Sequence, residues 1–184
     1  MELVGESQDA CLAFVGTLGY RRTRRRERLD SARALTGWIA DTGLLSTSAS
    51  AGPEDLDQAI LLREAIYRLA TAKLEGRRLA PTDVEILNDW ATRPTVTCRL
   101  RSGHLVRQGT VTQVLANLAR DAVELLGSSQ SQWLRECDDP ECTRLYVDRS
   151  RGHRRRWCGM EVCGNRVKAA EYRKRQRADP GSQG

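Results

Sequence analysis

Four cysteines near the C-terminal end constrain the fold of this chain more than any other feature. They form two pairs with the same spacing, Cys137-x4-Cys142 and Cys158-x4-Cys163, and fifteen residues separate the pairs. Two such pairs can hold one ion between two turns, and four thiolates at about 2.3 Å suit tetrahedral zinc. Four protein ligands close the shell, so we predict one structural Zn²⁺ whose binding folds a segment with little apolar core.

Two disulfides or a redox dithiol are the alternatives to zinc. No apolar run approaches the roughly 20 residues that span a membrane, and the chain does not open with a signal-peptide pattern. These features predict a cytoplasmic protein without a membrane segment, and a reducing cytoplasm disfavours disulfides. Redox dithiols usually have two residues between their cysteines, whereas each pair here has four. We therefore favour zinc.

The remaining cysteines and the neighbouring histidine have simpler interpretations. Cys11 and Cys98 lie in apolar contexts on expected strands, which predicts small core residues. His153 lies inside an arginine run, and we expect a surface side chain there instead of a fifth candidate ligand.

Basic residues are concentrated around the cysteines. Residues 143–177 carry twelve basic and three acidic side chains, a charge of +9, and because the whole chain is +6 the remainder is −3. This split predicts a polyanion-binding end on an otherwise ordinary domain. After Gly164 the sequence predicts a helix that continues to residue 177. The residues expected to contact nucleic acid are Arg154, Arg155, Arg156, Arg166, Lys168, Arg173 and Arg177.

The first two thirds of the chain predict a helical domain with a little sheet. Apolar residues recur at helical spacing in several segments, and Gly or Pro residues separate them. We expect a strand at 11–18, helices at 30–43, 53–75, 81–93 and 110–126, and a β-hairpin of 95–101 with 104–108. The predicted fold class is mainly α with a small β-sheet (α+β), as domain 1–128, followed by a zinc module at 129–180 that ends in a helix. A small-polar hinge at 127–132 marks the boundary.

Two segments resemble known families. RRWCGMEVCGNRVKAAEYRKR, with CDDPEC upstream, resembles the bacterial CGNR zinc finger, which is named after Cys163 to Arg166. Residues 11–126 resemble the ABATE domain that usually precedes this finger, through LAFVGTLGYRR and LLREAIYRLATAKLEGR. The resemblance implies a transcription regulator, with the finger as its DNA-binding element and the larger domain as a sensor. Members often have Asn before Thr in the first motif, where this chain has Gly16 before Thr17.

The sequence as a whole predicts a zinc-containing regulator that binds duplex DNA and is not an enzyme. A zinc-scaffolded RNA-binding or protein-interaction module is the alternative. There is no phosphate-binding loop, nucleophile elbow or suggestive Cys/His pair. A small-molecule ligand of the N-terminal domain and a homodimer are both compatible with the pattern, and the basic run from Arg21 to Arg28 falls in an expected loop of undetermined role.

Overall fold

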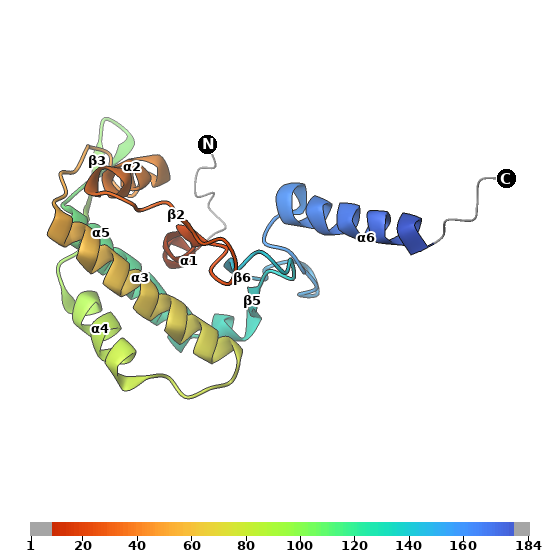
Figure 1. Ribbon diagram of the computed structural model, residues 1–184. Coiled ribbons are helices and arrows are strands. Elements are labelled where there is room, and N and C mark those ends of the chain that lie inside the picture. The colour runs from red at the N-terminus through yellow and green to blue at the C-terminus, as the bar shows by residue number, and fades with distance from the viewer. Residues whose placement is uncertain (1–8, 179–184) are drawn as a thin grey trace.

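The computed structural model describes residues 9–178, and Figure 1 shows a helical body from which the last helix projects. The body holds two long helices, α3 and α5, with shorter helices beside them, and the C-terminal helix is α6. The helices are α1 (Ala10–Val15), α2 (Ala32–Thr42), α3 (Pro53–Leu74), α4 (Pro81–Thr92), α5 (Val111–Gly127) and α6 (Asn165–Ala178). The strands are β1 (Leu18–Gly19), β2 (Arg26–Glu27), β3 (Thr97–Arg101), β4 (His104–Gln108), β5 (Leu134–Glu136) and β6 (Leu145–Val147). A 3-10 turn, η1 (Ser129–Trp133), and a π-helical turn, η2 (Met160–Gly164), complete the fold.

The predicted fold class is confirmed. Three antiparallel pairs, β1–β2, β3–β4 and β5–β6, accompany the helices, and the four-cysteine segment is followed by a final helix. The helices begin where the sequence offers caps: Thr110 accepts from the N–H of Gln113 at the start of α5, and Pro53 opens α3. Among residues 9–178, no helix is long and apolar enough to cross a membrane.

The expected strand at 11–18 is wrong, because its first part is the short helix α1. Cys11, Leu12, Phe14 and Val15 are buried, a spacing that places them on one side of a helix. The amide N–H groups of residues 12 and 13 donate to the Asp9 carbonyl, and the Cys11 N–H donates to Asp121 Oδ2 at 2.7 Å. This run is too short for its apolar spacing to distinguish a helix from a strand. Its tertiary packing therefore determines its conformation.

The hairpin is confirmed, but one expected core residue on it is not. β3 pairs with β4 from Thr97↔Gln108 to Arg101↔His104, and Gly103 provides the positive φ of +79° that the turn requires. The Cys98 side chain is exposed, unlike the buried Cys11. The residues of β3 are exposed and those of β4 are exposed or half-buried, so neither face of the hairpin lies in the core. The alternation of apolar and polar residues in its sequence therefore does not indicate burial.

A two-stranded ribbon joins the helical body to the zinc module, at the place where the sequence suggested only a hinge. Leu134, Leu145 and Val147 of β5–β6 belong to the same buried core as α1, α3 and α5. Tyr146 lies on the opposite face and packs with the cysteine cluster. The units expected at 1–128 and 129–180 therefore share packing across this ribbon.

The basic run from Arg21 to Arg28 makes contacts on both sides of that joint. Arg21 Nη1 donates to Glu64 of α3 at 2.6 Å, while its backbone N–H donates to Thr143 Oγ1 at 3.1 Å. Arg22 makes a two-pronged ion pair with Glu136 of β5. The role that the sequence left undetermined thus includes holding the two units together.

A buried arginine anchors the segment that carries this run. Arg63 of α3 is 1% exposed, and its guanidinium donates to both carboxylate oxygens of Glu27 at 2.6 and 2.7 Å. It also donates to Thr17 Oγ1 at 3.2 Å, so this threonine has a polar role even though Gly16 precedes it. Such a charge is tolerated in a core only when it is paired.

Candidate metal centre and basic surface

The four predicted ligands converge at one point. The Sγ atoms of Cys137, Cys142, Cys158 and Cys163 all lie within 4.8 Å of one another. Cys142 Sγ and Cys158 Sγ are 3.8 Å apart, and Cys158 Sγ and Cys163 Sγ are 3.6 Å apart. Ligands about 2.3 Å from a tetrahedral zinc lie about 3.8 Å from one another. The donor set and its spacing therefore fit one structural zinc.

Backbone hydrogen bonds hold the two cysteine loops against each other. The Cys137 N–H donates to the Arg144 carbonyl at 3.0 Å, and the Asp138 N–H donates to the Arg156 carbonyl at 2.9 Å. The Cys158 N–H donates to Cys137 Sγ at 3.4 Å, a bond of the kind that supports a coordinated thiolate. At Gly164, an added Cβ would lie 2.6 Å from Sδ of the exposed Met160, so that side chain would have to move aside.

Crowding of the sulfurs separates the pKa values of three of the thiols, those of Cys137, Cys142 and Cys158. Hydrogen bonds from Cys142 and then Cys158 hold the pKa of Cys137 well below its usual range. In return, the hydrogen bond to Cys137 raises the pKa of Cys142 to about 12, and the pKa of Cys158 rises for the same reason. Without a cation the cluster favours one thiolate, because further negative charges at this distance repel one another. A divalent cation removes that repulsion, and four thiolates then bind it together.

His153 is not part of the sulfur cluster. Its Nδ1 lies 2.6 Å from the Asp148 carbonyl, and its ring stacks on Trp133 at 3.4 Å between centroids. The side chain is half-buried, not fully on the surface as expected. Asp148 organises this loop, because its carboxylate accepts from Ser150 and from the Arg155 N–H. Burial alone would raise the pKa of Asp148, but these hydrogen bonds outweigh it and lower the pKa.

Three of the arginines expected at the nucleic acid have partners within the protein. Arg166 Nε donates to Asp139 Oδ2 at 2.7 Å, and its Nη2 lies 3.5 Å from Cys163 Sγ. Arg156 Nε donates to Asp138 at 2.8 Å. Arg155 donates to the Trp157 and Cys158 carbonyls and lies over the Tyr146 ring. Their side chains therefore also support the zinc loops.

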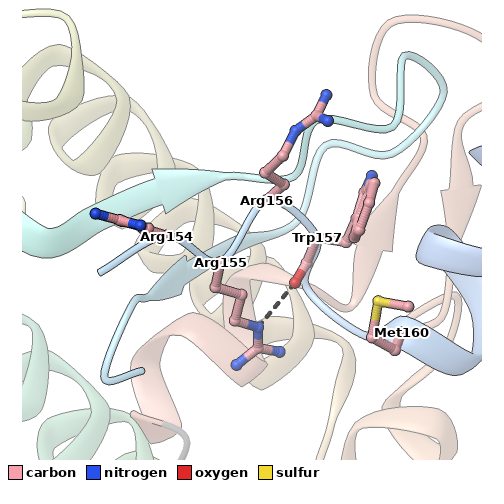
Figure 2. A pocket seen from close by; sticks show the side chains of 5 residues that line it. All are labelled: Arg154, Arg155, Arg156, Trp157 and Met160. Carbon is pink, nitrogen blue, oxygen red and sulfur yellow. Dashed lines mark hydrogen bonds between the residues drawn. The ribbon is translucent and has the colours of Figure 1, made fainter. Parts of the chain in front are cut away.

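The other expected cations point away from the fold. Arg154, Lys168 and Arg173 are exposed and have no ion pair or hydrogen bond from their side chains within residues 9–178. Figure 2 shows the guanidinium groups of Arg154, Arg155 and Arg156 directed apart around a hollow of about 370 Å³. Trp157 and Met160 form its apolar wall. The side chain of Arg177 lies outside the described residues.

Two supporting residues carried no clear signal in the sequence. Asp139 is 2% exposed inside the first cysteine loop and pairs with Arg166, but an acidic residue next to thiolates gives no reason to expect a partner in the helix. Tyr20 has a φ of +53°, and its hydroxyl lies 3.5 Å from Arg166 Nη1. This contact links the loop that follows β1 in the helical body to α6. Only the tertiary structure shows it.

Comparison with known proteins agrees with this architecture. The family model ABATE, described as "Putative stress-induced transcription regulator", matches residues 8–129. The CGNR zinc finger model matches residues 133–176. A search of curated proteins found no match. The first match spans most of the helical body, and the second contains all four sulfur ligands. The chain therefore belongs to the ABATE family of transcription regulators and carries a CGNR zinc finger after its ABATE domain.

Proposed function

We propose that this regulator binds duplex DNA through α6 and the loop that carries Arg154. One observation carries the proposal: the zinc-held end presents exposed cations that have no side-chain partner within residues 9–178. They are Arg154, Lys168, Arg173, Lys174 and Arg175. Unpaired, ordered cations are available to phosphate oxygens and can release the counterions that condense on DNA.

The arginines of the helical body provide the contrast. Arg21, Arg22, Arg63 and Arg68 are each paired with a carboxylate of the protein. An arginine already held by a carboxylate gains less from a phosphate, because the first pair must be broken. The helical body also has exposed arginines without an ion pair within residues 9–178, such as Arg99, so net charge makes the difference: residues 143–177 carry +9 and the remainder of the chain −3. Arg154 and α6 lie on either side of Trp157 and Met160.

The structural zinc would be held by the four cysteines and would supply the rigidity that a segment of this size lacks. α6 begins directly after Cys163 and the π turn, so the direction of the helix depends on the metal loops. Arg166 fixes the first turn to Asp139, and this contact helps to set the direction in which the helix projects. The helical body serves as sensor or dimerisation domain in this proposal, and the exposed Leu100 and Leu105 of its hairpin supply apolar surface for a second subunit.

The test is the salt dependence of affinity for duplex DNA, measured by fluorescence anisotropy with the zinc-loaded full chain. Log affinity should fall with log salt by about 0.9 for each phosphate neutralised. Lys168→Ala and Arg173→Ala should each weaken binding and reduce the slope by about 0.9. Arg99→Ala, an exposed arginine on β3, is the matched control and should change neither quantity.

Absence of duplex binding by the zinc-loaded chain would refute the proposal, and so would a slope that Lys168→Ala and Arg173→Ala leave unchanged. A marked preference for RNA over duplex DNA of the same sequence would instead support the RNA-binding alternative.

A further inference from the structure

One stripe along α6 carries no charge although the helix is strongly basic. Asn165, Ala169, Tyr172 and Gln176 follow one another at steps of four, three and four residues, which places them on one side of the helix. All four are exposed, and Tyr172 has 58% of its surface accessible. Within residues 9–178 the hydroxyl of this tyrosine bonds to Gln176 of the same stripe, and the helix projects from the body (Figure 1).

Basic residues border this stripe on both sides. Arg166 and Arg173 are seven residues apart and lie along one side, and Lys168 and Arg175 are seven apart and lie along the other. Arg166 and Val167 are half-buried, so the first turn of α6 presents these residues to the zinc loops. At about 100° per residue the uncharged stripe lies nearly opposite Val167 and about a quarter turn from Arg166, and its four residues are exposed.

This arrangement matches the major groove of B-DNA. The groove admits an α-helix, its floor presents base edges, and phosphates line both walls. An Asn or Gln amide recognises adenine through N6 and N7, and a small apolar side chain contacts the thymine methyl group. The basic rows would lie toward the two walls while the stripe lies toward the floor. Charge and chemistry thus agree along the described length of the helix.

The amide groups retain the atoms that such recognition needs. Gln176 Nε2 donates to Tyr172 Oη at 3.2 Å, which uses one of its two N–H groups and leaves the amide oxygen unengaged. Asn165 Nδ2 donates to the Glu161 carbonyl at 3.1 Å, with the same result. The hydrogen bond to Tyr172 also restricts the rotation of Gln176, so one amide is held in place on the stripe before DNA is bound.

We infer that α6 is a sequence-reading helix in which Asn165, Ala169, Tyr172 and Gln176 face the base edges of the major groove, with an adenine opposite Gln176. The inference rests on the proposed DNA binding and adds to it the residues that determine specificity. A second copy of α6 does not fit the same stripe, because its basic rows would lie against identical rows. Duplex RNA does not fit either, since its major groove is too deep and narrow for side chains to read.

The experiment selects bound duplexes from a random-sequence pool and sequences them, using the zinc-loaded full chain and three variants. The wild type should enrich a motif that contains adenine. Gln176→Ala should lose about tenfold of the preference at one adenine position while its affinity for the unselected pool stays within about twofold. Gln176→Glu should change the preferred base at that position to cytosine, because a carboxylate accepts from the cytosine amino group. Lys168→Ala should keep the motif and bind every duplex more weakly.

The outcomes separate the two claims. If the wild type binds no duplex, both the proposed function and this inference are refuted. Duplex binding without any motif, or a motif that neither Gln176 variant alters, overturns the sequence-reading stripe and leaves DNA binding intact. Preference for single-stranded RNA over duplex in direct competition also overturns it. Since Gln176 is exposed, zinc content equal to wild type verifies that each variant retains its fold.

Discussion

Individual side chains around the zinc site divide into four sulfur ligands and the residues that support them, such as Asp139 and Arg166. The duplicated spacing of the cysteines predicts their role, and the convergence of the four sulfurs agrees with a shared ion. The arginines are different, since Arg154 and Arg166 have the same chemistry in the sequence and opposite surroundings in the fold. Arg154 extends into solvent, whereas Arg166 is 31% exposed at its side chain and contacts Asp139 and Cys163. What a guanidinium faces depends on residues distant in the chain.

Arg166 therefore gives a sharp prediction at this scale. Arg166→Ala should lower zinc affinity by about tenfold to a hundredfold, the usual effect of losing a group that supports a ligand. The reason is that its guanidinium donates to Cys163 Sγ and neutralises the buried Asp139. Competition with a chromogenic chelator measures the affinity. Arg173→Ala, which removes an exposed arginine from the same helix, is the control and should leave it unchanged; equal zinc affinity in both variants would contradict the supporting role.

At the scale of elements, the long periodic segments and the β3–β4 hairpin were predicted from sequence, whereas the other short elements were not. The expected helices at 53–75 and 110–126 are α3 (Pro53–Leu74) and α5 (Val111–Gly127), because many apolar positions fix one face. α1 has six residues, and a run of that length is compatible with either a strand or a helix. Its tertiary contacts determine which of the two forms. The β1–β2 pair is shorter still, and what holds it is the ion pair between Glu27 and Arg63 of α3.

That ion pair predicts how the stability of the fold depends on pH. Burial alone would raise the pKa of Glu27, but hydrogen bonds from Arg63 outweigh it and lower the pKa. Since the folded-state pKa lies below the unfolded value of about 4.3, the carboxylate stabilises the fold above that pH. The contribution is lost as the pH falls through the folded pKa. Urea unfolding followed from pH 7 down to about pH 3, below the unfolded pKa, should show this decrease.

Glu27→Gln should flatten that pH dependence and lower the stability by about 1–3 kcal/mol at pH 7, because Arg63 would keep its buried charge with Glu64 as its remaining ion-pair partner. Glu85→Gln provides the control, since Glu85 is exposed on α4 and has no ion pair within residues 9–178. If both variants shared the wild-type pH profile, the Glu27–Arg63 pair would not anchor β2.

At the scale of the whole molecule, the zinc module and the helical body are less separable than their two family matches suggest. The polar residues at 127–132 are typical of a linker, yet they form the capped turn η1, in which Ser128 Oγ accepts from the Gln130 N–H. β5 and β6 then place three aliphatic side chains in the core of the helical body. Sequence patterns are local, so they cannot show that three-residue strands pack against helices as distant in the chain as α1 and α3.

The shared core predicts that removing zinc destabilises the helical body as well as the finger. Leu134, Leu145 and Val147 are held in the core by a ribbon whose far ends are fixed by Cys137 and the second cysteine loop. Each fully buried aliphatic side chain contributes about 1.5–3 kcal/mol. Because a change of 1 kcal/mol shifts the melting temperature of a chain this long by about 2–4 °C, partial release of the ribbon should lower it by at least about 5 °C.

Circular dichroism at 222 nm reports the helices during a thermal scan with and without a chelator, and Cys158→Ser should reproduce the chelated profile. Leu145→Ala should lower the melting temperature with zinc present and bring the chelated and zinc-loaded profiles closer together, because the variant weakens the packing that transmits the effect. Two independent transitions, with the larger one insensitive to chelator, would mean that the ribbon does not couple the two units.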